Sequence, residues 1–346
     1  MFLRCGCCII PRDVLERLAQ DPTLPVKTRA SLESTAAQEP IWRMLRAAQN
    51  RAIQARMIAT ESTLTLTRIP SVTVNDCQNT TSLPGKPVAK PGSSKDQTAK
   101  RAFDRTTDVV EFYKTCFGRN SIDDLGMTLM SSIHYDVNYN NAFWNGVHMT
   151  YGDGDGQLFL DFTRSNDVVA HELTHGVTEY TSGFVYTNEP GGLNESMSDV
   201  FGSMFRQWQK NQTSSRADWL IGADIVGPAA KARGYKCLRD LAHPGAAHCI
   251  SPQPFNYKNY IPGGDPHDNS GIPNHAFYLA AKAIGGRSWE KVGKVWYAAL
   301  TNKKATKNMK FKSFAKLTRS AAKTLFPADP AVYTAIDKAW TSVGVP

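Results

Sequence analysis

The spacing of apolar side chains changes along this 346-residue chain, from a period of two to the period of a helix. Three segments alternate between apolar and polar positions, which is typical of half-buried strands: 62–77, 128–137 and 147–151. Five others have apolar residues at helical spacing: 102–117, 274–284, 288–303, 311–325 and 330–343. This order predicts an α+β protein with a β-rich N-terminal lobe and a mainly helical C-terminal lobe.

Two more helices are predicted where the strand-rich and helical halves meet. Ser165 or Asn166 can cap the first helix, which ends near Ser182 before a glycine. The second covers residues 194–210 and follows the pair Gly191-Gly192.

The N-terminal unit has its own pattern. Residues 13–20 and 41–57 are predicted as amphipathic helices, separated by a polar connection over residues 21–40. A unit of about 56 residues is too small to be comfortably stable alone, so we expect it to dock on the rest of the chain. The sequence therefore predicts three parts: residues 1–56, 57–182 and 183–346.

Composition indicates a folded basic protein. Hydrophobic residues make up 41% of the chain, which excludes a wholly disordered protein. The net charge is +9, but Lys and Arg are scattered apart from a modest cluster over residues 303–312. No apolar run reaches the length of a membrane span, and the run in residues 1–10 is too short for a secretory signal. Secretion by another route and a cytoplasmic location both stay open.

Seven cysteines at irregular spacing indicate neither a disulfide framework nor a zinc finger: Cys5, Cys7, Cys8, Cys77, Cys116, Cys237 and Cys249. Pairing of Cys237 with Cys249 is left open by the sequence, as is the role of the N-terminal cysteines.

Two histidines four residues apart lie on the helix at the junction, in His171-Glu172-Leu173-Thr174-His175. Positions i and i+4 share one helix face, so both imidazoles can bind one metal ion. Glu172 between them can reach a water at that ion as a general base. Two unrelated histidines on one helix are the alternative, and the surrounding sequence has to decide between the two interpretations.

Glu195 follows His175 at a distance of 20 residues and is the candidate third ligand. A set of two His and one Glu leaves one position for water, the arrangement of catalytic rather than structural zinc. Asp199 can accept the remaining ring N–H of a ligand histidine and fix its tautomer, and Asn194 can do the same. We therefore predict one Zn²⁺ per chain, bound by His171, His175 and Glu195.

Five motifs occur in order between about Arg68 and Pro346, about four-fifths of the chain. They are residues 139–146 (YNNAFWNG), 151–156 (YGDGDG), the helix 171–175 (HELTH), 192–199 (GLNESMSD) and 269–274 (NSGIPN). In this order they resemble the thermolysin family of neutral metallopeptidases. The resemblance implies a two-lobed zincin fold with the zinc helix at the junction, and a zinc endopeptidase in which Glu172 activates the attacking water.

The same resemblance implies roles for further residues. Tyr186 and His267 match donors that hydrogen-bond the oxyanion, where charge appears only in the transition state. Arg239 matches the arginine that holds the substrate backbone, and Asn141 and Ala142 match the strand that pairs with it. Apolar residues match the wall of the leaving-group pocket, which implies cleavage before a bulky hydrophobic residue: Phe159, Phe162, Val168, Ile221 and Leu238.

Large members of the family carry a double calcium site near the active site, and this chain departs from that pattern. Asp167 and Asp218 match two ligand positions, but Arg206, Leu220 and Ala223 stand where three acidic ligands would be. Because Ca²⁺ needs several oxygen ligands, we predict that the double calcium site is absent and that the Arg206 charge replaces a cation.

Residues 1–56 resemble the short prosegment of the protealysin group, in which two isoleucines precede a Pro-Pro-x-x-Leu motif. The sequence Ile9-Ile10-Pro11-Arg12-Asp13-Val14-Leu15 matches, with arginine in place of the second proline. The implied role is intramolecular inhibition until the segment is cut, which would make the chain a zymogen. Cys5, Cys7 and Cys8 lie beside the motif, and the thiolate of one of them is a candidate ligand of the zinc in the inhibited state.

Two other kinds of function stay open. An aminopeptidase of the wider HExxH–Glu group would need an acidic cluster for a free α-amine, whereas residues 140–144 favour an internal peptide. A catalytically inactive binding protein, or a nucleic-acid binder using residues 303–312, is disfavoured by the intact Glu172 and by the lack of a nucleic-acid motif. We expect a monomer that acts on peptides or proteins, without a nucleic-acid partner.

Overall fold

The structure is a computed structural model that describes residues 8–41 and 69–346. The expectations for residues 42–57 and 62–68 lie outside the described residues. Within the described ranges, no helix is both long and apolar enough to cross a membrane.

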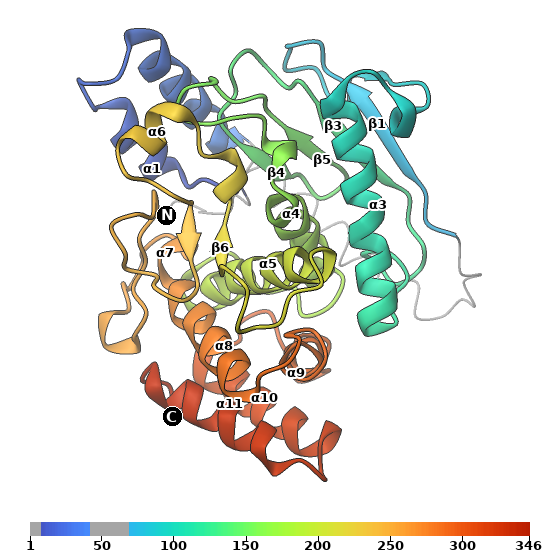
Figure 1. Cartoon of the computed structure of the whole chain (residues 1–346), viewed down its shortest axis with the longest axis vertical. Coiled ribbons are helices and arrows are strands. Elements are labelled where there is room, and N and C mark those ends of the chain that lie inside the picture. Colours follow the sequence, from blue (N-terminus) through green and yellow to red (C-terminus); the bar gives the residue numbers. More distant parts are fainter. Residues whose placement is uncertain (1–7, 42–68) are drawn as a thin grey trace.

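Two helices at the centre of the molecule connect its lobes: α4 (Asn166–Glu179) and α5 (Asn188–Gln209). Figure 1 shows the sheet on one side of them and the C-terminal helices on the other, which confirms the predicted two-lobed α+β fold. Every residue of α4 after Asn166 is buried. A Cβ on Gly202 of α5 would lie 2.7 Å from the carbonyl oxygen of Asp167, so the glycine permits close approach of the two helices.

The start of α5 corrects one prediction. The helix begins at Asn188, six residues before the expected start, so Gly191 and Gly192 lie inside it. A Cβ would lie 2.9 Å from Pro266 at Gly191, and 2.9 Å from Phe311 at Gly192. These two glycines therefore allow close packing of α5 against the segments around it.

The N-terminal lobe contains a five-stranded sheet in the order β2-β1-β3-β5-β4. The strands β1, β3 and β5 are parallel, and β2 and β4 are antiparallel to their neighbours at the two edges. The helix α3 (Gln97–Phe117) lies beside this sheet (Figure 1). The strand bounds are β1 Val72–Asp76, β2 Lys86–Pro87, β3 Leu129–Ile133, β4 Ala142–Trp144 and β5 Met149–Tyr151.

The C-terminal lobe is mainly helical, and its core contains the stacked rings of Trp296 and Trp340, with centroids 5.9 Å apart. The strands β6 and β7 form a short two-stranded sheet, and β6 contacts α5. The bounds are β6 Leu220–Ile221, α6 Pro228–Ala232, β7 Arg239–Asp240, α7 Pro266–Asn269, α8 Gly271–Ile284, α9 Val292–Leu300, α10 Phe311–Leu325 and α11 Pro330–Ser342.

The N-terminal unit begins with α1 (Arg12–Ala19), close to the predicted bounds. The predicted polar connection over residues 21–40 is wrong, because residues 26–41 are helical. Their buried positions are spaced as on a helix, but three of them are polar, which hides the apolar period: Thr28, Leu32, Thr35, Ala36 and Glu39.

One half-buried ion cluster joins three segments of the N-terminal lobe. The Nδ1 atom of His134 lies 2.8 Å from Asp153 Oδ2, and its Nε2 atom lies 3.0 Å from Asp96 Oδ2. Asp96 is also the N-cap of α3 and accepts from the Thr98 amide. The hydrogen bond to Asp153, together with Asp96, outweighs burial and raises the pKa of His134 to about 9.

We predict that His134 makes stability depend on pH. Its folded pKa lies above the ordinary value of 6.5, so its contribution is fully present below pH 6.5 and is lost as the pH rises through about 9. His134→Gln should lower the free energy of unfolding by about 2 kcal/mol at pH 6, a figure reduced for partial exposure, and by much less at pH 10. Urea unfolding at both pH values tests this, and an equal loss at both would contradict it.

Candidate active site

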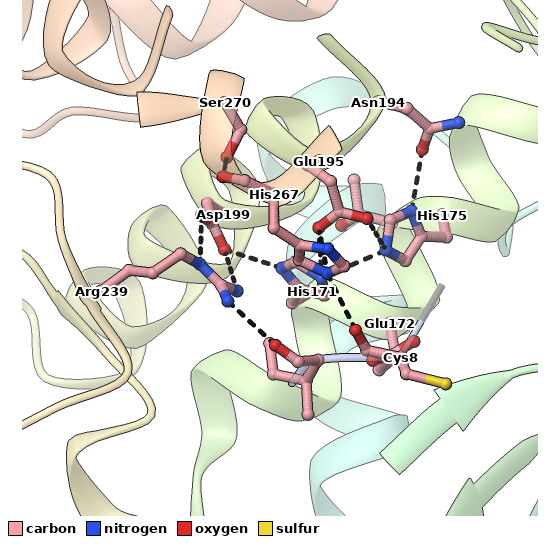
Figure 2. A network of polar contacts seen from close by, with 12 residues as sticks. Cys8, His171, Glu172, His175, Asn194, Glu195, Asp199, Arg239, His267 and Ser270 are labelled. Carbon is pink, nitrogen blue, oxygen red and sulfur yellow. Dashed lines mark hydrogen bonds and ion pairs between the residues drawn. The ribbon is translucent and has the colours of Figure 1, made fainter. Parts of the chain in front are cut away.

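Three metal-binding side chains converge between α4 and α5. The Nε2 atoms of His171 and His175 lie 3.1 Å apart. The Glu195 carboxylate oxygens lie 3.4 Å from each of these nitrogens. All three side chains are completely buried, and Figure 2 shows them directed at one another. The structure thus brings together the three ligands that the sequence predicts.

The hydrogen bonds behind the two rings show that this donor set fits a cation. The Nδ1 atom of His171 lies 2.8 Å from Asp199 Oδ1, and the Nδ1 atom of His175 lies 2.8 Å from Asn194 Oδ1. Because both oxygens only accept hydrogen bonds, each Nδ1 carries a proton. In a neutral ring Nε2 then has a lone pair, and the lone pairs of the two rings point at each other and repel. Within the described part of the chain, Glu195 Oε2 accepts no hydrogen bond. A Zn²⁺ ion removes both the repulsion and the unsatisfied oxygen.

Asp199 connects the metal ligands to a buried arginine. Besides His171, it accepts hydrogen bonds from Arg239 Nε at 2.8 Å and Nη2 at 2.7 Å. Asn274 of α8 donates to its other side at 2.9 Å. Burial opposes the charge, yet Arg239 and His171 hold the pKa of Asp199 well below its usual value. Asp199 therefore stays ionised and can orient both neighbours.

Glu172 lies next to the metal ligands. Its Oε2 atom accepts a hydrogen bond from the Trp144 amide of β4 at 3.0 Å, which fixes a completely buried carboxylate. The Tyr186 hydroxyl donates to Glu195 and lies 3.4 Å from the His267 ring. These side chains surround the metal ligands from both lobes.

His267 is held by an acidic neighbour at the start of α7. Its Nδ1 atom lies 2.7 Å from Asp265 Oδ1, and its Nε2 atom lies 3.2 Å from Glu195 Oε2. Burial opposes protonation, but Glu195 and Asp265 outweigh it and raise the pKa of His267 to about 9. The ring can therefore donate a hydrogen bond from Nε2 at neutral pH.

The predicted pocket wall is apolar in the structure. All of its members are completely or almost completely buried and belong to the continuous hydrophobic core: Phe159, Phe162, Val168, Ile221 and Leu238.

Residues 8–10 of the chain itself contact the groups predicted to bind a substrate backbone. The Ile9 amide donates to the Ala142 carbonyl at 3.1 Å, and Cys8 pairs with Phe143 as in an antiparallel sheet. Asn141 exchanges two hydrogen bonds with the Ile10 backbone, at 3.1 and 2.9 Å. The segment thus adds an extended strand to the edge of β4.

Two backbone carbonyls of this segment lie within hydrogen-bond distance of the two cationic side chains of the site. Arg239 Nη1 donates to the Ile9 carbonyl at 2.9 Å, and His267 Nε2 lies 2.9 Å from the Cys8 carbonyl oxygen. Figure 2 shows the Cys8 carbonyl directed at the site and its sulfur directed away. The hypothesis of a thiolate on the zinc is therefore wrong for Cys8, which packs with Cys77 and aromatic rings. Cys5 and Cys7 lie outside the described residues.

Comparisons with known proteins decide the family. The description "Thermolysin metallopeptidase, catalytic domain" matches residues 46–179, and "Thermolysin metallopeptidase, alpha-helical domain" matches residues 182–345. The chain belongs to the thermolysin family of metallopeptidases.

Individual relatives agree with this membership. The "Extracellular metalloprotease" of Pectobacterium carotovorum subsp. carotovorum is 43% identical over 283 residues, covering 79% of this chain and 80% of that protein. A "Thermolysin" of Alicyclobacillus acidocaldarius subsp. acidocaldarius is 36% identical over 290 residues, covering 81% of this chain and 52% of that protein.

A solved structure extends the similarity to the N-terminal unit. The "Precursor of Protealysin, Metalloproteinase from Serratia proteamaculans" has a TM-score of 0.82 and 37% identity, and the match covers 98% of this chain and 99% of that one. The predicted resemblance to the protealysin group is confirmed. Members of the thermolysin family are zinc-dependent proteases, so this chain is a metallopeptidase. The cluster of His171, His175 and Glu195 is a possible site for its zinc ion.

Two further residues hold side chains of the site in place and were not predicted from the sequence. Asn274 donates to Asp199, and Gln253 Nε2 donates to the His267 carbonyl at 2.5 Å and to Ser270 Oγ at 2.8 Å. Asn274 lies in the motif 269–274, so its position was visible although its partner was not. Gln253 lies in no motif, and the sequence contains no signal for it.

Proposed function

We propose that this thermolysin-family metallopeptidase is a zinc endopeptidase made as a zymogen, with His171, His175 and Glu195 as the zinc ligands. The proposal rests on one observation above all, the convergence of three completely buried ligand atoms beside Glu172. Zinc, when bound there, supplies a Lewis acid that polarises water and carbonyl groups.

The protein groups around the ligands then have distinct tasks. Glu172, fixed by the Trp144 amide, takes the proton from the attacking water. Tyr186 and His267 donate hydrogen bonds to the oxyanion as its charge develops. Arg239 and Asn141 hold the substrate backbone extended, so that the scissile carbonyl faces the site.

The specificity follows from the wall of the pocket. Phe159, Val168 and Leu238 are apolar and buried, so a bulky hydrophobic residue on the leaving-group side gains the most from binding. An internal peptide fits better than a free N-terminus, because the extended segment that contacts Asn141 and Arg239 is preceded by seven further residues of the chain. This supports an endopeptidase over an aminopeptidase.

Replacing the base tests the proposal directly. Glu172→Gln should lower the rate on an internally quenched peptide by about 10²- to 10⁴-fold, because proton removal from water is lost while the metal ligands remain. The zinc content of the variant, measured by elemental analysis, should equal that of the wild type. Glu111→Gln removes the same charge at an exposed site on α3 and should leave the rate unchanged. Equal rates for Glu172→Gln and wild type, or higher activity on amino-acid anilides, would contradict the assignment.

We also propose that residues 1–56 are an inhibitory prosegment, and that residues 57–182 and 183–346 form the two catalytic lobes. The segment 8–10 uses the hydrogen-bonding groups assigned to the substrate, including Asn141 and Arg239. The following helices add contacts that hold it in place: Arg17 donates to the Ile250 carbonyl at 2.6 Å, and Ser31 accepts from Asn140 at 3.0 Å. A substrate cannot occupy the same edge of β4 while these contacts persist.

The zymogen proposal predicts that activity appears together with a cut between roughly residues 45 and 65. Ile10→Asp places a charge at a position that is 1% exposed, so it should release the segment and raise the activity of the uncut chain about tenfold or more. Arg12→Ala changes an exposed side chain nearby and should have little effect. Mass spectrometry and peptide hydrolysis, followed in the same sample, test this. Full activity of the uncut wild-type chain would contradict it.

We propose further that the double calcium site of large family members is absent here and that the charge of Arg206 replaces a cation. Its guanidinium lies 3.5 Å from Asp167, 3.4 Å from Asp218 and 2.5 Å from Asp224. Asp167 is completely buried: burial raises its pKa, and Arg206 counters this by favouring the ionised form. One arginine thus lies within ion-pair distance of three carboxylates in this cluster.

Removing the arginine should therefore destabilise the chain. Arg206→Gln leaves a buried carboxylate without its cation, and we expect a loss of about 3 kcal/mol, seen as a lower melting temperature. Arg216→Gln, at an exposed position, should leave the melting temperature unchanged. A calcium-selective chelator with zinc in excess should not affect the wild type, and a marked drop in its melting temperature would refute the replacement.

A further inference from the structure

A second cluster of metal-binding side chains lies outside the proposed active site. Among the described residues, Cys237, His248 and Cys249 place one ligand atom each within 4.8 Å of one another. Cys237 and Cys249 are neighbours in a parallel bridge, and Lys236 and Ile250 donate backbone hydrogen bonds across it at 2.9 and 3.0 Å. The backbone therefore holds the two thiols on the same side.

The separation of the two sulfurs matches a shared metal ion. Cys237 Sγ lies 3.8 Å from Cys249 Sγ, far beyond the bond length of about 2.05 Å in a disulfide. Two bonds of about 2.3 Å to one zinc ion, at the tetrahedral angle, place their sulfurs roughly 3.8 Å apart. Cys237 is completely buried and Cys249 is 2% exposed, so solvent does not reach the pair freely.

The histidine is held in the manner of a metal ligand. His248 Nε2 lies 3.0 Å from Asp240 Oδ2, which leaves Nδ1 as the ring atom that can bind a cation. Asp240 is itself fixed, because its Oδ1 atom accepts from the Ala242 and His243 amides at 2.8 and 3.1 Å. A carboxylate behind a histidine, anchored in turn by the backbone, is the usual support of a ligand imidazole.

We propose that Cys237, His248 and Cys249 form a second metal site that takes Zn²⁺ or a similar borderline-soft divalent ion. Two thiolates and one imidazole suit such an ion, and His248, whose side chain is 26% exposed, marks the side where water completes the coordination. The ion would tie residue 237 to residues 248–249. Arg239, the proposed substrate-binding arginine, follows Cys237 by two residues, so the site would also fix the segment that carries it.

Cobalt provides a signal specific to this site. The reduced full-length chain is titrated with Co²⁺ without oxygen, and the near-ultraviolet band of thiolate-to-cobalt charge transfer is recorded. The cluster of His171, His175 and Glu195 contains no sulfur and cannot produce that band. We expect two metal ions per chain, one of which produces it. Glu195→Gln should weaken the other ion and leave the band in place, so failure of the proposed active site remains distinguishable.

Single variants assign the band to its ligands. Cys237→Ser and Cys249→Ser should each abolish it and reduce the metal content from two ions to one, while the remaining ion shows that the chain has folded. His248→Ala should weaken the second ion at least tenfold. Cys116→Ser, on α3, is the matched control and should change neither measurement.

Three results would overturn the proposal. One is a metal content of a single ion per wild-type chain. Another is a band that survives Cys237→Ser and is lost when Cys5, Cys7 and Cys8 are replaced. The third is a Cys237–Cys249 disulfide in the metal-saturated chain, found by mass spectrometry as the loss of two hydrogens from the pair.

Discussion

The carboxylate of Asp199 is the single group on which the geometry of this site depends most. It lies on α5 and accepts hydrogen bonds from His171 of α4, Arg239 of β7 and Asn274 of α8. One completely buried charge therefore orients a proposed zinc ligand and the proposed substrate-binding arginine together. Because these partners come from different elements of the fold, displacement of any one of them changes the environment of the other two.

Such a buried set of charges is stable only if its members balance. Asp199 is paired with Arg239, and Glu195 faces His171, His175 and His267. Desolvation of each charge costs several kcal/mol, and removing one partner leaves that cost uncompensated. The close packing of α4 on α5, which Gly202 permits, keeps water out and makes each pairing strong. Because the proposed ligands are buried, their lone pairs and charge are unsatisfied when no cation is present. Their arrangement therefore fits a metal ion.

The sequence predicted the chemistry of the site better than the shape around it. His171 and His175 were predictable because one helix fixes the positions i and i+4. Glu195 was predictable because it follows His175 by 20 residues, in a second predicted helix. Gln253 was not, since its contact with His267 depends on a loop packing against α7 in space. The helix over residues 26–41 was missed because the polar residues Thr35 and Glu39 occupy buried positions, and Thr35 accepts from the Asn140 amide far along the chain. Local spacing is encoded locally, whereas burial of a polar residue depends on tertiary contacts.

The proposed inhibition needs no chemical lock, and its strength comes from connectivity. Residues 8–10 make ordinary backbone hydrogen bonds to Asn141, Ala142 and Arg239, as any extended peptide can. While the chain is intact these contacts are intramolecular, so the segment competes at a high effective concentration, which for linked partners is of the order of millimolar. After a cut, the same contacts belong to a bimolecular equilibrium, and dilution favours release of the segment. The single proline-to-arginine change in the motif is consistent with this, because Arg12 is exposed and the segment is held through its backbone.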